Sequence, residues 1–292
     1  MFTVDFRQVD VFTSVPFKGN PVAVVMDAHF LSSEQMQEIA RWTNLSETTF
    51  VLSPEHKTAD YRVRIFTPGG ELPFAGHPTI GTAWALLEAG VIVARDGLII
   101  QECEAGLIQL AVNTTSLGTV HIAFELPEPV ITELTTGQTD RLEEILGCRI
   151  DRSLCPALID VGARWIVAHA ENARSVINLT PDYALLGEHD KSMNVTGLCI
   201  YGEHDTESDF KIEVRSFAPA CGVNEDPVCG SGNGSVAAFL RHHNVMLPES
   251  RQILSSQGQV TGRDGKLKMT LSDGKIWVGG NAVTCISGKI MV

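Results

Sequence analysis

The sequence contains one pattern twice, and this repeat constrains the fold more than any other feature. The first copy comprises residues 61–68 (YRVRIFTP) and 74–83 (FAGHPTIGTA), and the second comprises residues 211–219 (KIEVRSFAP) and 228–237 (VCGSGNGSVA). Each copy predicts a strand, a loop with a glycine, and then a helix rich in small residues. Two such copies predict a chain of two similar lobes.

A glycine stands at the start of each predicted helix, Gly76 in the first copy and Gly230 in the second. The first N–H groups of a helix have no partner within the helix, so they can bind an anion. If the two lobes face each other, both helix starts point into one cleft. We therefore expect backbone N–H groups at Gly76 and Gly230 to bind an anion.

Hydrophobic periodicity and turn residues predict mixed secondary structure along the rest of the chain. Helices are expected at 32–43, 78–89, 139–146 and 181–186, and strands at 3–12, 21–26, 48–52, 60–67, 163–168, 259–261, 266–271, 275–279 and 282–287. Several further short strands are expected between residues 95 and 124. These elements predict an α+β fold of two pseudo-symmetric lobes, each a mostly antiparallel sheet wrapped around a central helix. The N-terminal lobe is expected to comprise residues 1–118 plus 279–292, and the C-terminal lobe residues 119–278.

Composition excludes several classes of partner. The 292 residues carry 22 basic and 35 acidic side chains, a net charge of −13 that disfavours binding to nucleic acid or to an anionic membrane. The seven cysteines form no C-x-x-C pair, so neither a disulfide framework nor a metal site is expected. The sequence contains no secretory signal and no stretch of 18 apolar residues, which predicts a cytoplasmic protein without a membrane span.

Glu47 is a candidate catalytic acid or base. It lies between a predicted helix and a predicted strand, next to apolar residues. Partial desolvation there would raise the pKa of its carboxyl from about 4.3 toward neutrality, the range that general acid–base catalysis needs. The alternative is a surface glutamate that makes one ordinary hydrogen bond.

His77 stands where the first small-residue helix is expected to begin. Pro78 suits the first helical position, which makes His77 a candidate N-cap and leaves the Gly76 N–H accessible to a ligand. The alternative is a tight turn in which His77 only caps the helix.

Residues 225–234 (EDPVCGSGNG) form the densest polar cluster of the sequence. Gly230 and Ser231 offer hydrogen-bond donors at the second helix start, and the Asp226 carboxylate could accept a hydrogen bond from substrate. No lysine follows the glycines, and their spacing differs from G-x-G-x-x-G, so neither nucleotide-binding loop is indicated. A simple cap and turn remains the alternative.

Cys229 lies at the same helix start, where a thiolate is stabilised. A racemase that uses two bases would need a second base at the equivalent position of the first copy. That position is Ala75, so we interpret Cys229 as a packing residue, with a cysteine-dependent racemase or epimerase as the alternative function.

Together these segments resemble the PhzF-like family of phenazine biosynthesis, within the diaminopimelate epimerase-like superfamily. The resemblance rests on residues 10–13 (DVFT), 17–25 (FKGNPVAVV), 46–50 (SETTF), 76–79 (GHPT) and 225–234. It implies a homodimer without metal or organic cofactor, and a reaction that isomerises a dihydro-hydroxyanthranilic acid. Cys229 departs from the threonine that is usual in the family.

By this resemblance Glu47 carries the proton. His77, Asp226 and Ser231 position the substrate and assist the transfer, while the N–H groups of Gly76 and Gly230 hold the carboxylate. The predicted function is a cofactor-independent isomerase that shifts a proton within a small carboxylic acid. A non-catalytic protein that binds small acids is the alternative from another class.

Overall fold

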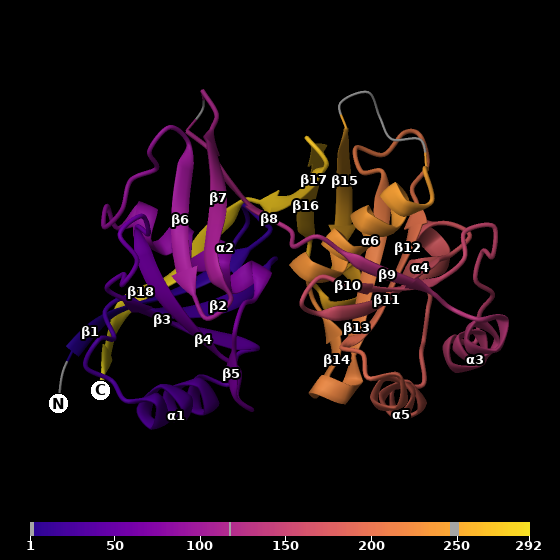
Figure 1. The fold of residues 1–292 in the computed structure, drawn as a ribbon, viewed down its shortest axis with the longest axis horizontal. Helices are drawn as coiled ribbons and strands as arrows, with labels where there is room; N and C mark the ends of the chain where they lie inside the picture. The colour runs from indigo at the N-terminus through magenta and orange to yellow at the C-terminus, as the bar shows by residue number, and fades with distance from the viewer. Residues whose placement is uncertain (1–2, 117, 246–250) are drawn as a thin grey trace. The chain divides into compact units, whose positions relative to one another are not determined.

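The chain folds into two compact units, each a sheet combined with helices. The computed structural model describes residues 3–116, 118–245 and 251–292. One unit comprises Met1–Glu125 with Gly279–Val292, and the other comprises Leu126–Val278. Figure 1 shows strands and helices mixed within both units, which confirms the predicted α+β class.

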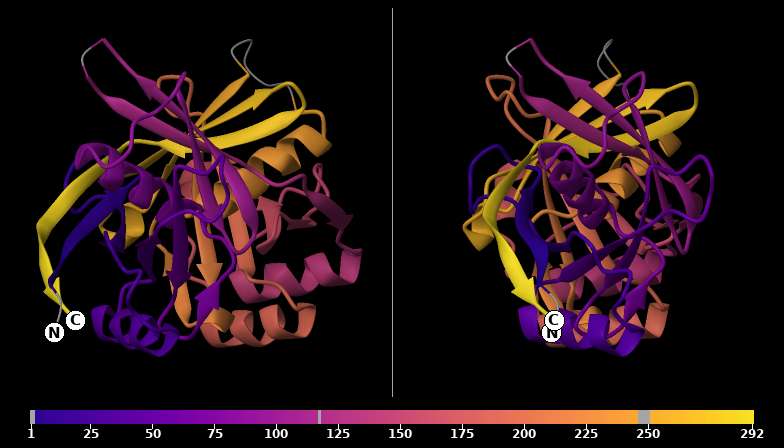
Figure 2. Two further views of the ribbon diagram at one scale, coloured as in Figure 1. Left: turned by 60° about the vertical axis from the view of Figure 1, so that its left-hand side comes forward. Right: turned by 90° about the vertical axis from the view of Figure 1, so that its left-hand side faces the viewer.

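The sheet of the first unit has the strand order β18–β1–β2–β3–β4–β6–β7–β8. Its strands are β1 (Thr3–Val11), β2 (Asn20–Val25), β3 (Glu47–Leu52), β4 (Tyr61–Phe66), β5 (Glu71–Leu72), β6 (Leu98–Cys103), β7 (Gly106–Thr114), β8 (Val120–Glu125) and β18 (Ala282–Met291). The pairs β2–β3 and β4–β6 are parallel, and the other neighbours are antiparallel. The last strand, β18, lies beside the first strand, β1, as both views of Figure 2 show.

The sheet of the second unit has the order β9–β10–β11–β12–β13–β15–β16. Its strands are β9 (Val130–Glu133), β10 (Ala157–Asp160), β11 (Arg164–His169), β12 (Gly197–Glu203), β13 (Ile212–Ala218), β14 (Val223–Asp226), β15 (Gln252–Gln257) and β16 (Gly265–Ser272). Strand β17 (Lys275–Gly280) leads the chain back into the first unit.

The two sheets repeat one topology. The order β1–β2–β3–β4–β6–β7 corresponds to β10–β11–β12–β13–β15–β16, with the parallel pairs at equivalent places. The central helices α2 (Gly76–Glu88) and α6 (Gly230–His242) each have 13 residues and begin at equivalent glycines. The sequence repeat is therefore a structural repeat.

Each central helix is buried along most of its length, which small residues allow. Ten residues of α2 and ten of α6 are buried. A Cβ added to Gly81 would lie 2.3 Å from the Val22 side chain, and one added to Gly234 would lie 2.7 Å from Leu126. The strands thus approach these helices more closely than larger side chains would permit.

Other helices cover the opposite faces of the sheets. Helix α1 (Ser33–Thr43) packs Met36 and Ala40 against Phe50, while the adjacent Thr49 bonds to Thr82 of α2. Because successive residues of a strand point to opposite faces, α1 and α2 lie on opposite sides of the sheet. In the second unit, α3 (Thr136–Leu146) and α5 (Tyr183–Met193) share a core cluster. The short α4 (Ala173–Ile177) contacts β12 and β13.

The same Arg–Glu ion pair occurs in both units. Arg64 of β4 bonds to both carboxylate oxygens of Glu71, at 2.6 Å each. At the equivalent positions Arg215 of β13 bonds to both oxygens of Glu225, at 2.9 and 2.7 Å. In each unit the pair ties a sheet strand to the short strand that precedes the central helix.

The two Arg–Glu pairs differ in burial. The Arg64 and Glu71 side chains are 23% and 29% exposed, whereas those of Arg215 and Glu225 are 2% and 8% exposed. Arg215 also donates to the carbonyls of Val176, Ile177 and Leu179 at the end of α4. The second pair is therefore a desolvated ion pair whose remaining donor sites are satisfied.

Most predicted elements are present, and one prediction is wrong. Residues 259–261 form a 3₁₀ helix rather than a strand. Gly258 and Gly262 flank it with φ angles of 103° and 75°, a left-handed conformation that interrupts extended structure. The prediction failed because the amino-acid composition of this segment does not show that both glycines have positive φ angles.

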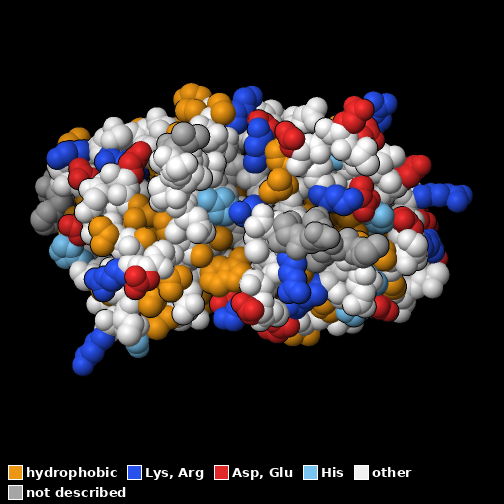
Figure 3. Space-filling view, turned by 90° about the horizontal axis from the view of Figure 1, so that it is seen from above, with side chains coloured by type: hydrophobic (Ala, Val, Ile, Leu, Met, Phe, Trp, Pro, Cys, Tyr) orange, Lys and Arg blue, Asp and Glu red, His pale blue; other side chains and the backbone are white. Residues whose placement is uncertain are grey.

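Charge on the surface is mixed. Figure 3 shows basic and acidic side chains interspersed over one face of the molecule. Among the described residues, no helix has the length and apolar character that a membrane crossing requires.

Replacing Glu225 with Gln should destabilise the second unit far more than replacing Glu71 with Gln destabilises the first. Glu225→Gln leaves the buried Arg215 guanidinium without its counter-ion, which costs about 3 kcal/mol. Glu71→Gln removes a partly exposed pair, worth about 0–1 kcal/mol. Urea denaturation of the two variants measures both losses. Equal losses would contradict the asymmetry inferred from burial.

Candidate active site

Glu47 is the first residue of β3 and lies at the junction between α1 and this strand. Asn44 ends α1 in the left-handed conformation, with φ of 53°, and redirects the chain toward the sheet. Glu47 then pairs in register with Val22 of β2. The Glu47 side chain is only 15% exposed, so it is not an ordinary surface glutamate.

His77 lies against this carboxyl group. The distance between His77 Nε2 and Glu47 Oε2 is 3.2 Å, and the His77 side chain is 6% exposed. That distance is at the long end of the hydrogen-bond range, and substrate binding can shorten it. The structure thus brings together two of the predicted catalytic residues within the first unit.

The prediction that His77 caps the helix is wrong. Ala75 is the N-cap of α2, Gly76 is the first residue and His77 is the second. Pro78 is tolerated at the third position because none of the first N–H groups of a helix has a partner within it. Ala75 offers no capping side chain, so no side-chain hydrogen bond caps this helix start.

Burial sets the protonation of Glu47. Desolvation raises the pKa of its carboxyl from 4.5 to about 7, and the Ser46 hydroxyl opposes this shift. Near neutral pH the group is therefore divided between its acid and its base forms. A carboxyl in this state can both remove and return a proton.

A second carboxyl has a similar shift but different surroundings. Burial raises the pKa of Glu213 to about 7, and its side chain accepts a hydrogen bond from Ser256. Glu213 and Arg215 point to the same face of β13, whereas Ser216 faces α6, next to Gly232. Glu213 therefore lies on the face of the sheet opposite α6, away from the other predicted site residues of this unit.

The second unit brings Asp226, Gly230 and Ser231 together. Asp226 ends β14, and its carboxylate accepts the N–H of Val228 at 3.0 Å. Gln257 of β15 holds the same turn, because it donates to the Asp226 carbonyl at 2.9 Å and accepts from the Cys229 N–H at 3.2 Å. Gly230 and Ser231 begin α6.

Trp165 contacts Ser231, and the sequence did not predict this contact. Its indole Nε1 donates to the Ser231 Oγ at 3.0 Å. The two residues are 66 positions apart, and only the pairing of β11 with its neighbours brings them together. The local sequence around Trp165 predicted only a strand and gave no indication of a contact with Ser231.

Cys229 is a buried thiol whose surroundings disfavour the thiolate. Burial raises its pKa well above 9, and the nearby Asp226 and Cys199 raise it further. Its Sγ is the N-cap acceptor for the Gly232 N–H, at 3.3 Å. Desolvation thus outweighs the helix start, which by itself would favour the thiolate.

The strand registers show which residues of the two copies are equivalent. Thr48 pairs with Phe66 and Leu198 pairs with Phe217, so Glu47 corresponds to Gly197. A Cβ at Gly197 would lie 1.9 Å from the Phe217 carbonyl oxygen, so no side chain fits there. The second unit therefore lacks an equivalent of the Glu47 carboxyl.

The remaining site residues also differ between the copies. His77 corresponds to Ser231, and Leu72 corresponds to Asp226. The first unit thus carries a carboxyl–imidazole pair, and the second carries a hydroxyl, a carboxylate and a glycine-rich helix start.

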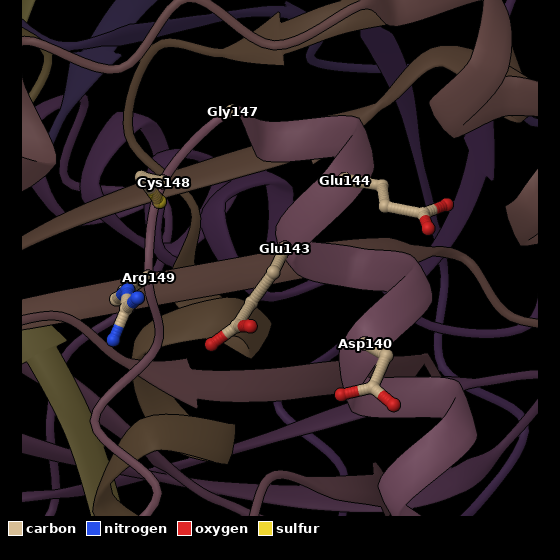
Figure 4. A pocket seen from close by; sticks show the side chains of 6 residues that line it. All are labelled: Asp140, Glu143, Glu144, Gly147, Cys148 and Arg149. Atoms are coloured by element: carbon tan, nitrogen blue, oxygen red, sulfur yellow. The ribbon is translucent and has the colours of Figure 1, made fainter.

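A hollow beside α3 is chemically unsuited to an acidic substrate. It is lined by Asp140, Glu143, Glu144, Gly147, Cys148 and Arg149. Figure 4 shows the three carboxylates extending from the helix. Arg152 lowers the pKa of Glu143, which therefore stays charged and would repel a carboxylate.

One surface group has the donor types of a metal site. Glu133, His242 and His243 place one ligand atom each within 4.8 Å of one another. Glu133 and His242 already form an ion pair at 3.2 Å, and His243 bonds to the Cys155 carbonyl. His242 ends α6, about 18 Å along the helix from Gly230, so this group is remote from the helix start.

Comparison with known proteins assigns the family. The family profile described as "Phenazine biosynthesis-like protein" matches residues 9–288. Antisense-enhancing sequence 1 of Schizosaccharomyces pombe is 43% identical, with 98% of each chain covered. Trans-2,3-dihydro-3-hydroxyanthranilate isomerase of Pseudomonas chlororaphis is 36% identical, over 97% of this chain and 98% of that protein.

Solved structures agree. A phenazine biosynthesis protein of the PhzF family from Bacillus anthracis superposes with a TM-score of 0.88 at 26% identity, with 100% of both chains covered. The chain therefore belongs to the phenazine biosynthesis-like, or PhzF, family and is an isomerase. The resemblance stated from the sequence is confirmed.

Glu47→Gln should stabilise the protein in a pH-dependent way. Because folding raises the pKa of Glu47 from 4.5 to about 7, the folded state holds the proton more tightly than the unfolded state. Wild-type stability should therefore fall as pH rises from about 4.5 to about 7, and the full penalty of about 3 kcal/mol should persist above pH 7. The variant lacks this penalty.

Thermal unfolding at pH 5 and pH 8 measures the difference. The gain in melting temperature from Glu47→Gln should be larger at pH 8. The exposed Glu38→Gln on α1 is the matched control and should give the same small change at both pH values. A gain from Glu47→Gln that does not depend on pH would contradict burial of an ionisable Glu47.

Proposed function

We propose that this isomerase moves a proton within a small carboxylic acid, with Glu47 as the acid–base group and without a metal or organic cofactor. The observation that carries the proposal is the buried Glu47 carboxyl, with a pKa raised to about 7 and His77 Nε2 at 3.2 Å. The base form removes a proton from an activated C–H bond. The resulting acid form returns it elsewhere on the same molecule.

His77 orients the Glu47 carboxyl and disperses the charge that changes during transfer. A proton-transfer group contributes about 10²–10⁴-fold to the rate, so positioning and electrostatic stabilisation supply the remainder. We assign the positioning to the N–H groups at Gly76 and Gly230 and to Ser231 and Asp226. Helix starts suit this task because their N–H groups favour a carboxylate.

The names of the relatives guide the choice of substrate to test. Relatives from three Pseudomonas species are named trans-2,3-dihydro-3-hydroxyanthranilate isomerase, and the Pseudomonas aeruginosa protein is 37% identical over 89% of this chain. That acid has an activated C–H bond and a carboxylate, as the proposal requires. We therefore propose this acid, or one of the same chemical class, as substrate. The family resemblance also supports a homodimer, which analytical ultracentrifugation tests.

A cysteine-dependent racemase is disfavoured, because Cys229 is buried with a raised pKa and its equivalent in the first copy is Ala75. A non-catalytic binding protein is distinguished by experiment. It would be stabilised by small acids without exchanging substrate hydrogen for deuterium.

Glu47→Gln should reduce turnover of trans-2,3-dihydro-3-hydroxyanthranilate by at least about 10³-fold, because the amide cannot accept the proton. Substrate binding should change little, since Gln has the same shape. Turnover is followed by NMR in D₂O, which also detects incorporation of deuterium. Glu38→Gln is the control and should keep full activity. Unchanged turnover in Glu47→Gln would remove Glu47 from the mechanism.

The wild-type enzyme should show kcat/KM that rises with pH through an apparent pKa of about 7, because the free enzyme needs Glu47 in its base form. The raised pKa fixes the direction: activity is lost as pH falls below about 7. Initial rates between pH 5 and pH 9 measure the profile. A rising limb near the ordinary glutamate value of about 4.3 would show that another group controls the reaction.

A further inference from the structure

The side chain of Trp165 lies beneath the start of α6. Trp165 is the second residue of β11 and is 3% exposed. Its Nε1 donates to the Ser231 Oγ at 3.0 Å. An indole N–H is only a donor, so the Ser231 oxygen is the acceptor in this bond.

This contact fixes what Ser231 can offer to a ligand. A hydroxyl has one proton to donate and accepts through its oxygen. The oxygen has two lone pairs, and Trp165 uses one of them, so the indole orients the hydroxyl and directs its proton away from Trp165, toward a ligand. Cys229 Sγ competes for the Ser231 proton, but it lies 3.7 Å from the Ser231 Oγ, and sulfur is a weak acceptor.

The backbone groups at this helix start have the same polarity as the directed hydroxyl proton. Ser231 is partly exposed, while Gly230 and Ser231 are the first two residues of α6, where backbone N–H groups have no partner within the helix. Cys229 Sγ accepts the N–H of Gly232, one residue further on. The helix start therefore presents donors, and an oxygen acceptor is the complementary ligand group.

The structural repeat shows that this arrangement belongs to one copy. Trp165 pairs in register with Gly197, whereas the equivalent pair of the first unit is Val22 with Glu47. The strand pair that carries a proton-transfer group in one unit thus carries an indole donor in the other.

We propose that Trp165 is a positioning residue that holds Ser231 as a hydrogen-bond donor, so that the start of α6 selects a carboxylate oxygen over an uncharged amide. The inference rests on the proposed function insofar as the substrate is a small carboxylic acid. It adds a residue and a basis for selectivity that do not depend on which group transfers the proton.

Binding of 3-hydroxyanthranilate provides the test. This aromatic acid carries the substituents of the proposed substrate but has no saturated carbon from which a proton can be removed. Isothermal titration calorimetry compares it with 3-hydroxyanthranilamide, in which the carboxylate is replaced by an amide. Trp165→Phe removes the indole N–H and keeps an aromatic side chain.

Trp165→Phe should weaken binding of the acid by about 5- to 10-fold, the loss of one oriented hydrogen bond to an anion. The preference for acid over amide should fall by a similar factor, because the Ser231 hydroxyl can then rotate and turn a lone pair toward the amide NH₂. Trp84→Phe is the matched control. Trp84 Nε1 donates to the Thr284 hydroxyl at 3.1 Å in the first unit, so its loss should leave both affinities unchanged.

A double-mutant cycle separates positioning from packing. In a Ser231→Ala background Trp165→Phe should have no further effect on acid binding, because the indole no longer acts through a hydroxyl. An equal loss in both backgrounds, or an unchanged preference for acid over amide in Trp165→Phe, would overturn the inference. So would a wild-type protein that does not bind the acid. Proton transfer by Glu47 is judged separately, by deuterium incorporation, so failure of either idea is recognised independently.

Discussion

A bidentate ion pair, between an arginine of the sheet and a glutamate of the following short strand, holds the loop before each central helix. In the second unit this pair is buried, and the arginine also binds three carbonyls at the end of α4. A buried guanidinium tolerates little displacement, because each donor that loses its acceptor is left desolvated. Glu225 is followed directly by Asp226, so the pair fixes where the polar cluster and the α6 start lie.

The two copies share this scaffold and differ in the side chains it presents. Glu47 and His77 stand in the first copy where Gly197 and Ser231 stand in the second. Because the repeat constrains the backbone, each copy could change these few positions without a new fold. Desolvation then acts with opposite results on two groups: it brings the carboxyl into the range of proton transfer, and it keeps the Cys229 thiol protonated.

Local patterns predicted much of the fold. The helix predicted at 32–43 is α1, whose start Ser32 and Gln35 cap, and the repeat correctly predicted two central helices. The raised pKa of Glu47 was expected from its local surroundings, whereas the approach of His77 to Glu47 and the contact of Trp165 with Ser231 could not be derived from spacing. These contacts depend on strand pairing between distant segments. The predicted start of α2 at residue 78 was two residues too late, because Pro78 is tolerated beyond the first position of the helix.

The antiparallel pairing of β1 with β18 has a consequence for synthesis of the chain. Arg7 and Ser287, which bond across these strands, are 280 residues apart. On the ribosome, the segment Leu126–Val278 is therefore complete before the first unit receives its final strand. One edge of β1 stays unpaired until β18 has been synthesised, and a chain truncated before β18 would expose that edge to the aggregation that open strands promote.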